Sequence, residues 1–176
     1  MTNLSRNDYL YDLVAPKTIH GSMFHQGLFT TAVTDVVAAG ATIDIGLTTG
    51  SEQIVLSGFF VSTTSGEIDA TIYGGSVFTG GSATNMFSMN DNMTFDASLA
   101  TIVSAPTVTD LGSQKTVNYV IRGEGGNNLT TDFYQIPYIF APNTSYLFRV
   151  TNNDSSSDTI DLVVFGFKNI ITPMVD

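Results

Sequence analysis

The chain has 176 residues, of which 43% are hydrophobic and only 12% are charged. One domain is expected at this length, because a single core can bury most of the apolar surface. Sixteen acids outweigh six scattered basic residues and give a net charge of −10. Binding to phosphates needs clustered Lys and Arg, and an anionic membrane would repel this charge, so neither nucleic acid nor a membrane is expected as a partner.

The chain contains no cysteine. Disulfides, thiolate metal sites and cysteine nucleophiles are therefore excluded. No apolar run reaches the roughly 18 residues that a membrane-spanning helix needs. Residues 1–12 are polar where a secretory signal would be apolar, so we expect synthesis in the cytoplasm without a signal peptide.

Residues 1–27 show neither strand alternation nor a helical stripe, and Pro16, Gly21 and Gly27 interrupt any longer element. Apolar residues without secondary structure of their own need a preformed surface to pack on. We therefore predict an N-terminal arm over residues 1–27 that contacts a partner. Its expected partner-binding residues are Tyr9, Leu10, Leu13, Met23 and Phe24.

From Leu28 onward the chain is a series of short, alternating segments with turn residues every eight to twelve positions. This spacing is typical of a β-sandwich or barrel. The expected strands are 28–37, 41–45, 53–62, 67–73, 94–103, 117–122, 133–140, 146–150 and 160–167, with loops over 76–92 and 105–113 and a bulge at Gly58. We predict an all-β antiparallel β-sandwich of the jelly-roll type over residues 28–168, followed by a C-terminal tail over 169–176.

The last two strands are the strongest fold signal. In the second of them Ile160, Leu162, Val164 and Gly166 would share one face. The polar run between the strands, 152–158, is rich in Asn, Asp and Ser, which favour turns. The pattern predicts a β-hairpin made of two central strands.

Two groups of side chains were considered as metal sites. His20 and His25 are the only histidines, but the glycines around them argue against the helix that a paired zinc site needs. Residues 152, 154, 156 and 158 carry oxygen atoms at alternate positions, like the first half of a calcium loop, but the Gly and the bidentate Glu of such loops are missing. We expect no metal and no cofactor.

Three carboxylates, Asp44, Asp69 and Asp161, lie on alternating strands, as a pair of glycosidase carboxylates would. Each falls at an outward position of its strand, so exposure to solvent is the simpler interpretation. No G-x-S-x-G nucleophile motif and no phosphate-binding glycine loop occurs. The sequence predicts no enzyme.

Several phrases in order resemble one family. They are residues 40–45 (G-A-T-I-D-I), 49–50 (T-G), 70–73 (A-T-I-Y), 105–109 (A-P-T-V-T) and above all 141–152 (A-P-N-T-S-Y-L-F-R-V-T-N). Together, over residues 20–168, they resemble the capsid decoration (cement) proteins of tailed bacteriophages. The resemblance implies a β-sandwich on the exterior of the capsid, commonly a trimer, with no catalytic residues.

The predicted function is therefore that of a structural virion protein, made in the host cytoplasm, which cements the shell by binding the major capsid protein. The acidic charge suits a surface that faces away from packaged DNA. The alternative is a receptor- or glycan-binding head domain of a phage fibre, in which exposed Tyr and Phe would stack on sugars.

Overall fold

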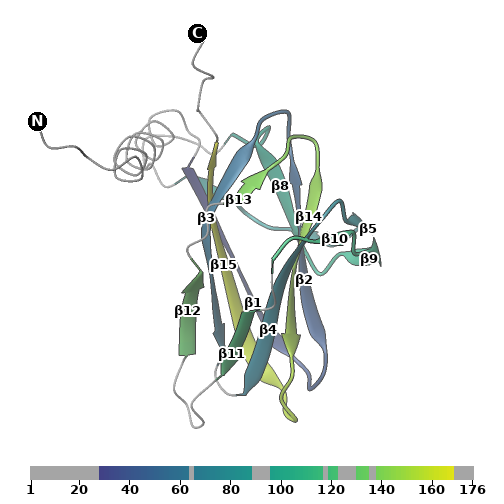
Figure 1. Cartoon of the computed structure of the whole chain (residues 1–176), viewed down its shortest axis with the longest axis vertical. Coiled ribbons are helices and arrows are strands. Elements are labelled where there is room, and N and C mark those ends of the chain that lie inside the picture. Colours follow the sequence, from purple (N-terminus) through teal and green to yellow (C-terminus); the bar gives the residue numbers. More distant parts are fainter. Residues whose placement is uncertain are drawn as a thin grey trace, which may run out of the picture.

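The computed structural model describes residues 28–63, 66–88, 96–116, 119–122, 130–134 and 138–168 (Figure 1). Within these ranges every regular element is a β-strand. The strands are β1 (Leu28–Val37), β2 (Thr42–Thr49), β3 (Ile54–Thr63), β4 (Glu67–Gly74), β5 (Val77–Thr79), β6 (Ser82–Ala83), β7 (Phe87–Ser88), β8 (Ala100–Ser104), β9 (Thr107–Asp110), β10 (Ser113–Gln114), β11 (Tyr119–Arg122), β12 (Thr130–Tyr134), β13 (Tyr138–Phe140), β14 (Ser145–Asn152) and β15 (Asp158–Lys168).

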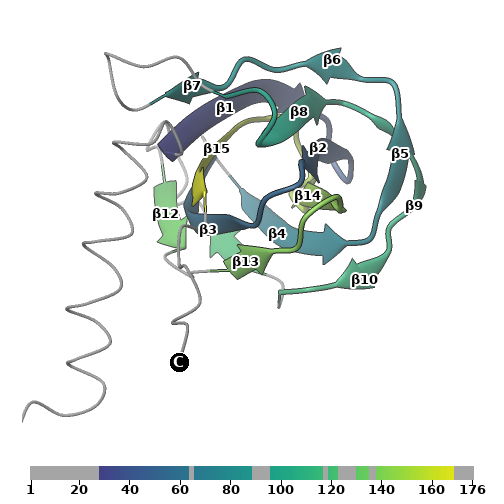
Figure 2. The same ribbon diagram turned by 90° about the horizontal axis from the view of Figure 1, so that it is seen from above.

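Two antiparallel sheets make up the sandwich (Figure 2). Sheet A has six strands in the order β12-β3-β15-β1-β7, with β13 also paired to β3. Sheet B has seven strands in the order β10-β4-β14-β2-β8-β6, with β11 also paired to β4. The prediction of an all-β antiparallel β-sandwich is confirmed. The jelly-roll type stays a prediction, and the arm and the tail, 1–27 and 169–176, lie outside the described residues.

Strand alternation builds the core between the sheets. In β2 the inward residues Ile43, Ile45 and Leu47 are buried, whereas their neighbours in sequence face away from the core. The register aligns β2 with β14, so that Ile45 lies beside Phe148 on the same face. From sheet A, Ile160, Leu162 and Val164 of β15 meet this layer, as the alternation predicted. Burying each large apolar side chain contributes about 1.5–3 kcal/mol.

Aromatic rings fill one end of the core. The ring of Phe140, from β13, stacks on Tyr146 with a centroid distance of 4.0 Å. The same ring meets the edge of Phe148 at 6.1 Å. The hydroxyl of Tyr146 accepts a hydrogen bond from the backbone N–H of Ala141 at 2.7 Å, which satisfies the polar end of a buried side chain.

The prediction that the last two strands form a β-hairpin is wrong. Both strands are central, but β14 lies in sheet B between β4 and β2, whereas β15 lies in sheet A between β3 and β1. The polar residues 153–157 therefore connect the two sheets and do not join paired neighbours. The local sequence pattern is the same whether two successive strands pair in one sheet or lie in two facing sheets. In both cases one face of each strand is buried, and a polar loop makes the turn between them.

The bulge predicted in β3 is present. Phe165 of β15 is opposite Gly58, and the next residue, Gly166, is opposite Leu56, so Ser57 is the extra residue. The bulge switches which residues face inward: Ile54 and Leu56 precede it, and Phe59 and Val61 follow it, yet all four are buried. A glycine beside the extra residue allows this change of phase.

The loops at one end of the sandwich are held together by Thr49. Its hydroxyl donates to the carbonyl of Ala141 at 2.7 Å and accepts from the N–H of Thr144 at 2.9 Å. The N–H of Asn143, whose φ is 49°, donates to the carbonyl of Gly50 at 2.7 Å. The strand expected over 41–45 continues to Thr49, because these contacts tie Thr49 to the residues before β14.

Candidate interaction surfaces

The outward face of sheet B carries a small second layer that the sequence did not reveal. Strands β5 and β9 pair with each other and lie beside this sheet, on the side away from sheet A (Figure 2). The ring of Phe78, from β5, lies over Gly46 so closely that an added Cβ would be 2.5 Å from it. Leu147, the neighbour of Gly46 in register, is 0% exposed although it faces away from the main core. We name the pair of strands β5 (Val77–Thr79) and β9 (Thr107–Asp110) the flap.

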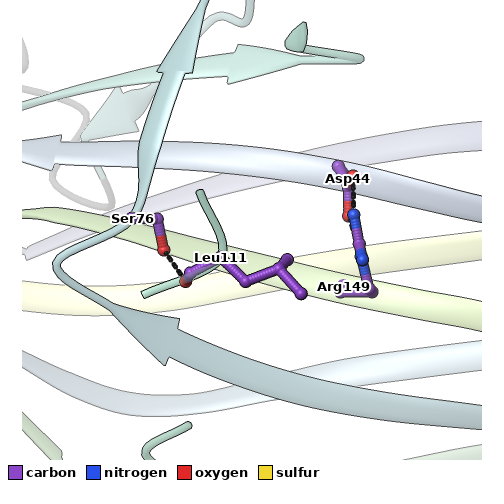
Figure 3. A network of polar contacts seen from close by, with 4 residues as sticks. All are labelled: Asp44, Ser76, Leu111 and Arg149. Carbon is purple, nitrogen blue, oxygen red and sulfur yellow. Dashed lines mark hydrogen bonds and ion pairs between the residues drawn. The ribbon is translucent and has the colours of Figure 1, made fainter. Parts of the chain in front are cut away.

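Hydrogen bonds of Ser76 hold the base of the flap, and its backbone N–H donates to the carbonyl of Ser145 in β14 at 3.2 Å. The hydroxyl of Ser76 donates to the carbonyl of Leu111 at 2.6 Å (Figure 3). The sequence pattern predicted a turn region over 105–113, and β9 lies within it. β9 was missed because its residues are mostly exposed and show no apolar alternation.

Next to the flap, Asp44 and Arg149 form a bidentate ion pair on the outward face of sheet B (Figure 3). The Arg149 Nε and Nη2 atoms each lie 2.7 Å from one carboxylate oxygen of Asp44. The hydrogen bond that Arg149 donates to Asp44 raises the pKa of Arg149 above its ordinary value, whereas partial burial lowers this pKa. The two residues are directly opposite in register on β2 and β14, so the pair bridges two central strands.

The interpretation of Asp44 as a solvated carboxylate is therefore wrong. Its side chain is 12% exposed and that of Arg149 is 25% exposed. A paired, half-buried guanidinium is not available to bind an external phosphate or carboxylate without breaking this bond.

The other two outward carboxylates have different surroundings. Asp69 lies opposite Thr151 on the outward face of sheet B, and its Oδ1 atom is buried and has no hydrogen-bond partner among the described residues. Asp161 lies in sheet A and accepts a hydrogen bond from the hydroxyl of Ser62 at 3.1 Å. Asp161 is thus on a different sheet from the other two, and the three carboxylates do not meet at one place.

The side-chain oxygen atoms of residues 152, 154 and 158 accept hydrogen bonds from the loop itself and from β3. Asn152 is 0% exposed; its amide donates to the carbonyls of Val37 and Ser156, both at 2.9 Å, and its Oδ1 accepts from the N–H of Asp154 at 2.9 Å. Asp154 accepts from the N–H of Ser155 at 2.6 Å. Buried Asp158 accepts from the hydroxyl of Thr63. The contacts of Asn152 thus join the β1–β2 and β14–β15 loops.

No group of three or more His, Cys, Asp or Glu residues suited to a metal ion is found in the part of the chain that the structure describes. His20 and His25 lie outside it. The predicted partner-binding residues Tyr9, Leu10, Leu13, Met23 and Phe24 also lie outside it.

Large apolar side chains are exposed on several strands. Val36 of β1 is 68% exposed and Phe87 of β7 is 60% exposed, both in sheet A. The others are Val77, Val120 and Ile139. These residues lie on five strands, of which β7 and β11 are short strands at the sides of their sheets. The described surface therefore presents its apolar contacts singly, mainly near strand edges.

Among the described residues, no helix is long and apolar enough to cross a membrane.

No protein-family model matches the chain, and no curated protein matches it. Among solved structures, the chain is similar to the VP2 subviral particle protein of infectious bursal disease virus, with 11% identity and a TM-score of 0.21 over 80% of this chain and 41% of that one. It is also similar to T=1 particles of the D431N mutant of the same VP2, with 13% identity and a TM-score of 0.20 over 83% of this chain and 40% of that one. The chain thus spans about two fifths of the VP2 chains. A likeness at this TM-score does not identify a shared fold or function.

Proposed function

We propose that this chain is a structural virion protein that decorates and stabilises a bacteriophage capsid by binding the outer surface of the major capsid protein shell. The observation that carries the proposal is that buried polar side chains bind the loops at both ends of the sandwich. Asn152 at one end of the sandwich and Thr49 at the other tie neighbouring loops together through backbone hydrogen bonds. Such contacts restrain the loops at both ends of the sandwich, which suits a part that adds stiffness to a shell.

The order of the strands supports the predicted jelly-roll type of the sandwich. The first four strands alternate between the sheets, and the last two return between them: β14 lies between β2 and β4, and β15 lies between β1 and β3. A strand that returns beside earlier ones is the mark of a Greek key, and two such keys make a jelly roll.

The charge of the chain supports an exterior position. With a net charge of −10, the protein would be repelled by packaged DNA and would be soluble at the high concentration at which shells assemble. We propose that it assembles as a homo-oligomer, a trimer, made in the host cytoplasm, and that the arm over residues 1–27 supplies the main contacts.

Replacing arm residues tests this arrangement. Changing Tyr9, Leu10 and Leu13 together to Ala should weaken binding to capsids by about 3 kcal/mol or more, over a hundredfold, because each anchoring side chain contributes roughly 1 kcal/mol or more. The melting temperature should stay near that of the wild type, because the core is formed by β1 to β15.

A matched control changes the polar arm residues Asn3, Ser5 and Asn7 to Ala, which should leave capsid binding unchanged. If the apolar triple variant binds capsids as the wild type does, or if it fails to fold, the arm is not the docking element.

A further inference from the structure

Strand β1 has an open edge. β7 pairs with β1 only at Phe29 and Thr30. The residues that precede β7 leave the strand: the N–H of Thr84 donates to the carbonyl of Ile102 in sheet B. Along residues 32–37, β1 therefore pairs with β15 on one side, and no described strand pairs with it on the other.

The backbone of this segment points outward at alternate residues. The N–H of Val36 donates to the side chain of Asp35 at 2.8 Å, in an exposed position, and so it faces away from β15. Because antiparallel pairs alternate, the N–H and C=O groups of Thr34 and Ala32 face the same way. All three residues and Asp35 are exposed. These groups form a template for one more strand.

The segment lacks most of the features that protect an edge. Natural edges are blocked by charged side chains, Pro, bulges, inward-pointing charges or very short strands, and Asp35 is the one such feature in this segment. Residues 32–37 read A-V-T-D-V-V, with Asp35 as the only charge and Val36 68% exposed. This composition favours strand pairing.

The charges around the edge select the kind of strand that fits. Asp35 is exposed on the edge, on the face of the strand that it shares with its register partner Ile160, and Asp161, opposite Thr34 on β15, adds a negative charge on the other face. The described basic residues lie elsewhere: Arg149 is paired with Asp44, Lys115 lies beside Gly74, Arg122 is in β11 and Lys168 ends β15. A second copy of the chain, at a net charge of −10, would bring the same acids to this edge.

We propose that residues 32–37 of β1 bind an extended segment of another protein, which adds a strand to sheet A and places a basic residue beside Asp35. Backbone hydrogen bonds to Ala32 and Thr34 and to the carbonyl of Val36 would supply the attraction. The N–H of Val36 would exchange its bond to Asp35 for one to the added strand, which leaves the carboxylate of Asp35 to select a basic residue. This inference goes beyond the proposed function, since it holds whichever particle the protein belongs to.

Two synthetic peptides test the proposal. Both have blocked ends and alternate Thr and Val over ten residues; one carries two central Lys residues and the other two central Glu residues. They are titrated into the full chain, labelled with ¹⁵N, at low salt. The Lys peptide should shift the amide signals of Ala32, Thr34 and Val36, and should bind about threefold more tightly than the Glu peptide.

Two variants separate the backbone from the charge. Thr34→Pro removes an outward N–H without breaking a bond to β15, so it should abolish binding, whereas Thr34→Val keeps the N–H and should bind as the wild type does. Asp35→Lys should reverse the preference between the two peptides. This variant keeps the test valid if Thr34→Pro does not fold.

Three results would overturn the proposal. The first is that neither peptide shifts these amides at about 1 mM. The second is that Asp35→Lys leaves the preference unchanged. The third is that the protein without peptide shows concentration-dependent shifts at the same amides, because the edge would then pair with a second copy.

Discussion

Replacing Asn152 should lower the stability of the sandwich far more than its single uncharged side chain suggests. The residue is 0% exposed, and its amide reaches the carbonyls of Val37 and Ser156 at 2.9 Å and that of Ala38 at 3.3 Å. In Asn152→Ala these carbonyls lose their donor and the N–H of Asp154 loses its acceptor.

The size of the effect follows from these bonds. Each buried hydrogen bond contributes about 1 kcal/mol net, so the loss of two strong donated bonds and one accepted bond should cost about 3 kcal/mol. In a domain of this size that corresponds to a fall in melting temperature of about 6–12 °C. Asn152→Asp should cost at least as much, because a carboxylate would face three carbonyl oxygens.

Urea denaturation followed by circular dichroism measures the change. The midpoint should fall while the slope with denaturant stays constant, which marks a change of stability in a two-state transition. The matched control is Asn153→Ala, since Asn153 is exposed and its backbone N–H, which the substitution keeps, donates to the carbonyl of Glu67. If Asn152→Ala lies within about 0.5 kcal/mol of the wild type, Asn152 does not hold the loops together.

Three further predictions concern the ion pair, the flap and the polar loop. A double-mutant cycle with Asp44→Asn and Arg149→Gln should give a coupling of about 1 kcal/mol in urea denaturation. Because the pKa of Arg149 is raised, the guanidinium stays charged through neutral pH and loses its proton in strong alkali, so a coupling that disappears between about pH 6 and 9 would contradict the ion pair. Gly46→Ala should destabilise the protein by about 1–3 kcal/mol, because its Cβ would displace the ring of Phe78, and Phe78→Leu should restore part of the loss; additive effects would contradict the contact. Added calcium should not shift the melting temperature, because side-chain oxygens of the 152–158 loop already accept hydrogen bonds from backbone N–H groups of the loop. A rise of several degrees that a chelator reverses would reveal a calcium site.

The class of the fold could be predicted from local pattern alone. Alternation along β2, β4 and β15 fixed which residues face the core, and Gly58 marked the bulge, because both signals depend only on near neighbours in sequence. The pairing of strands could not be predicted in this way. Whether the strands on either side of residues 153–157 pair with each other or lie in facing sheets depends on distant partners, and Asn152 meets Val37 across 115 positions.

The surface features were hidden for the same reason. Asp44 has the polar, outward position of a solvated carboxylate, and its partner Arg149 lies 105 residues away. The flap follows from Phe78 and Gly46, neither of which stands out in the sequence. The open edge of β1 could not be predicted either, because the order of the strands in a sheet decides which strand lies at its edge.

The most direct test of the structural role is the number of copies of this protein in a purified particle, measured by quantitative mass spectrometry against the major capsid protein. A decoration protein covers the shell, so the proposal predicts hundreds of copies, in a fixed ratio to the capsid protein that reflects the symmetry of the shell. A count in the tens would contradict it and favour the head domain of a fibre, and absence from the particle would contradict a virion role altogether.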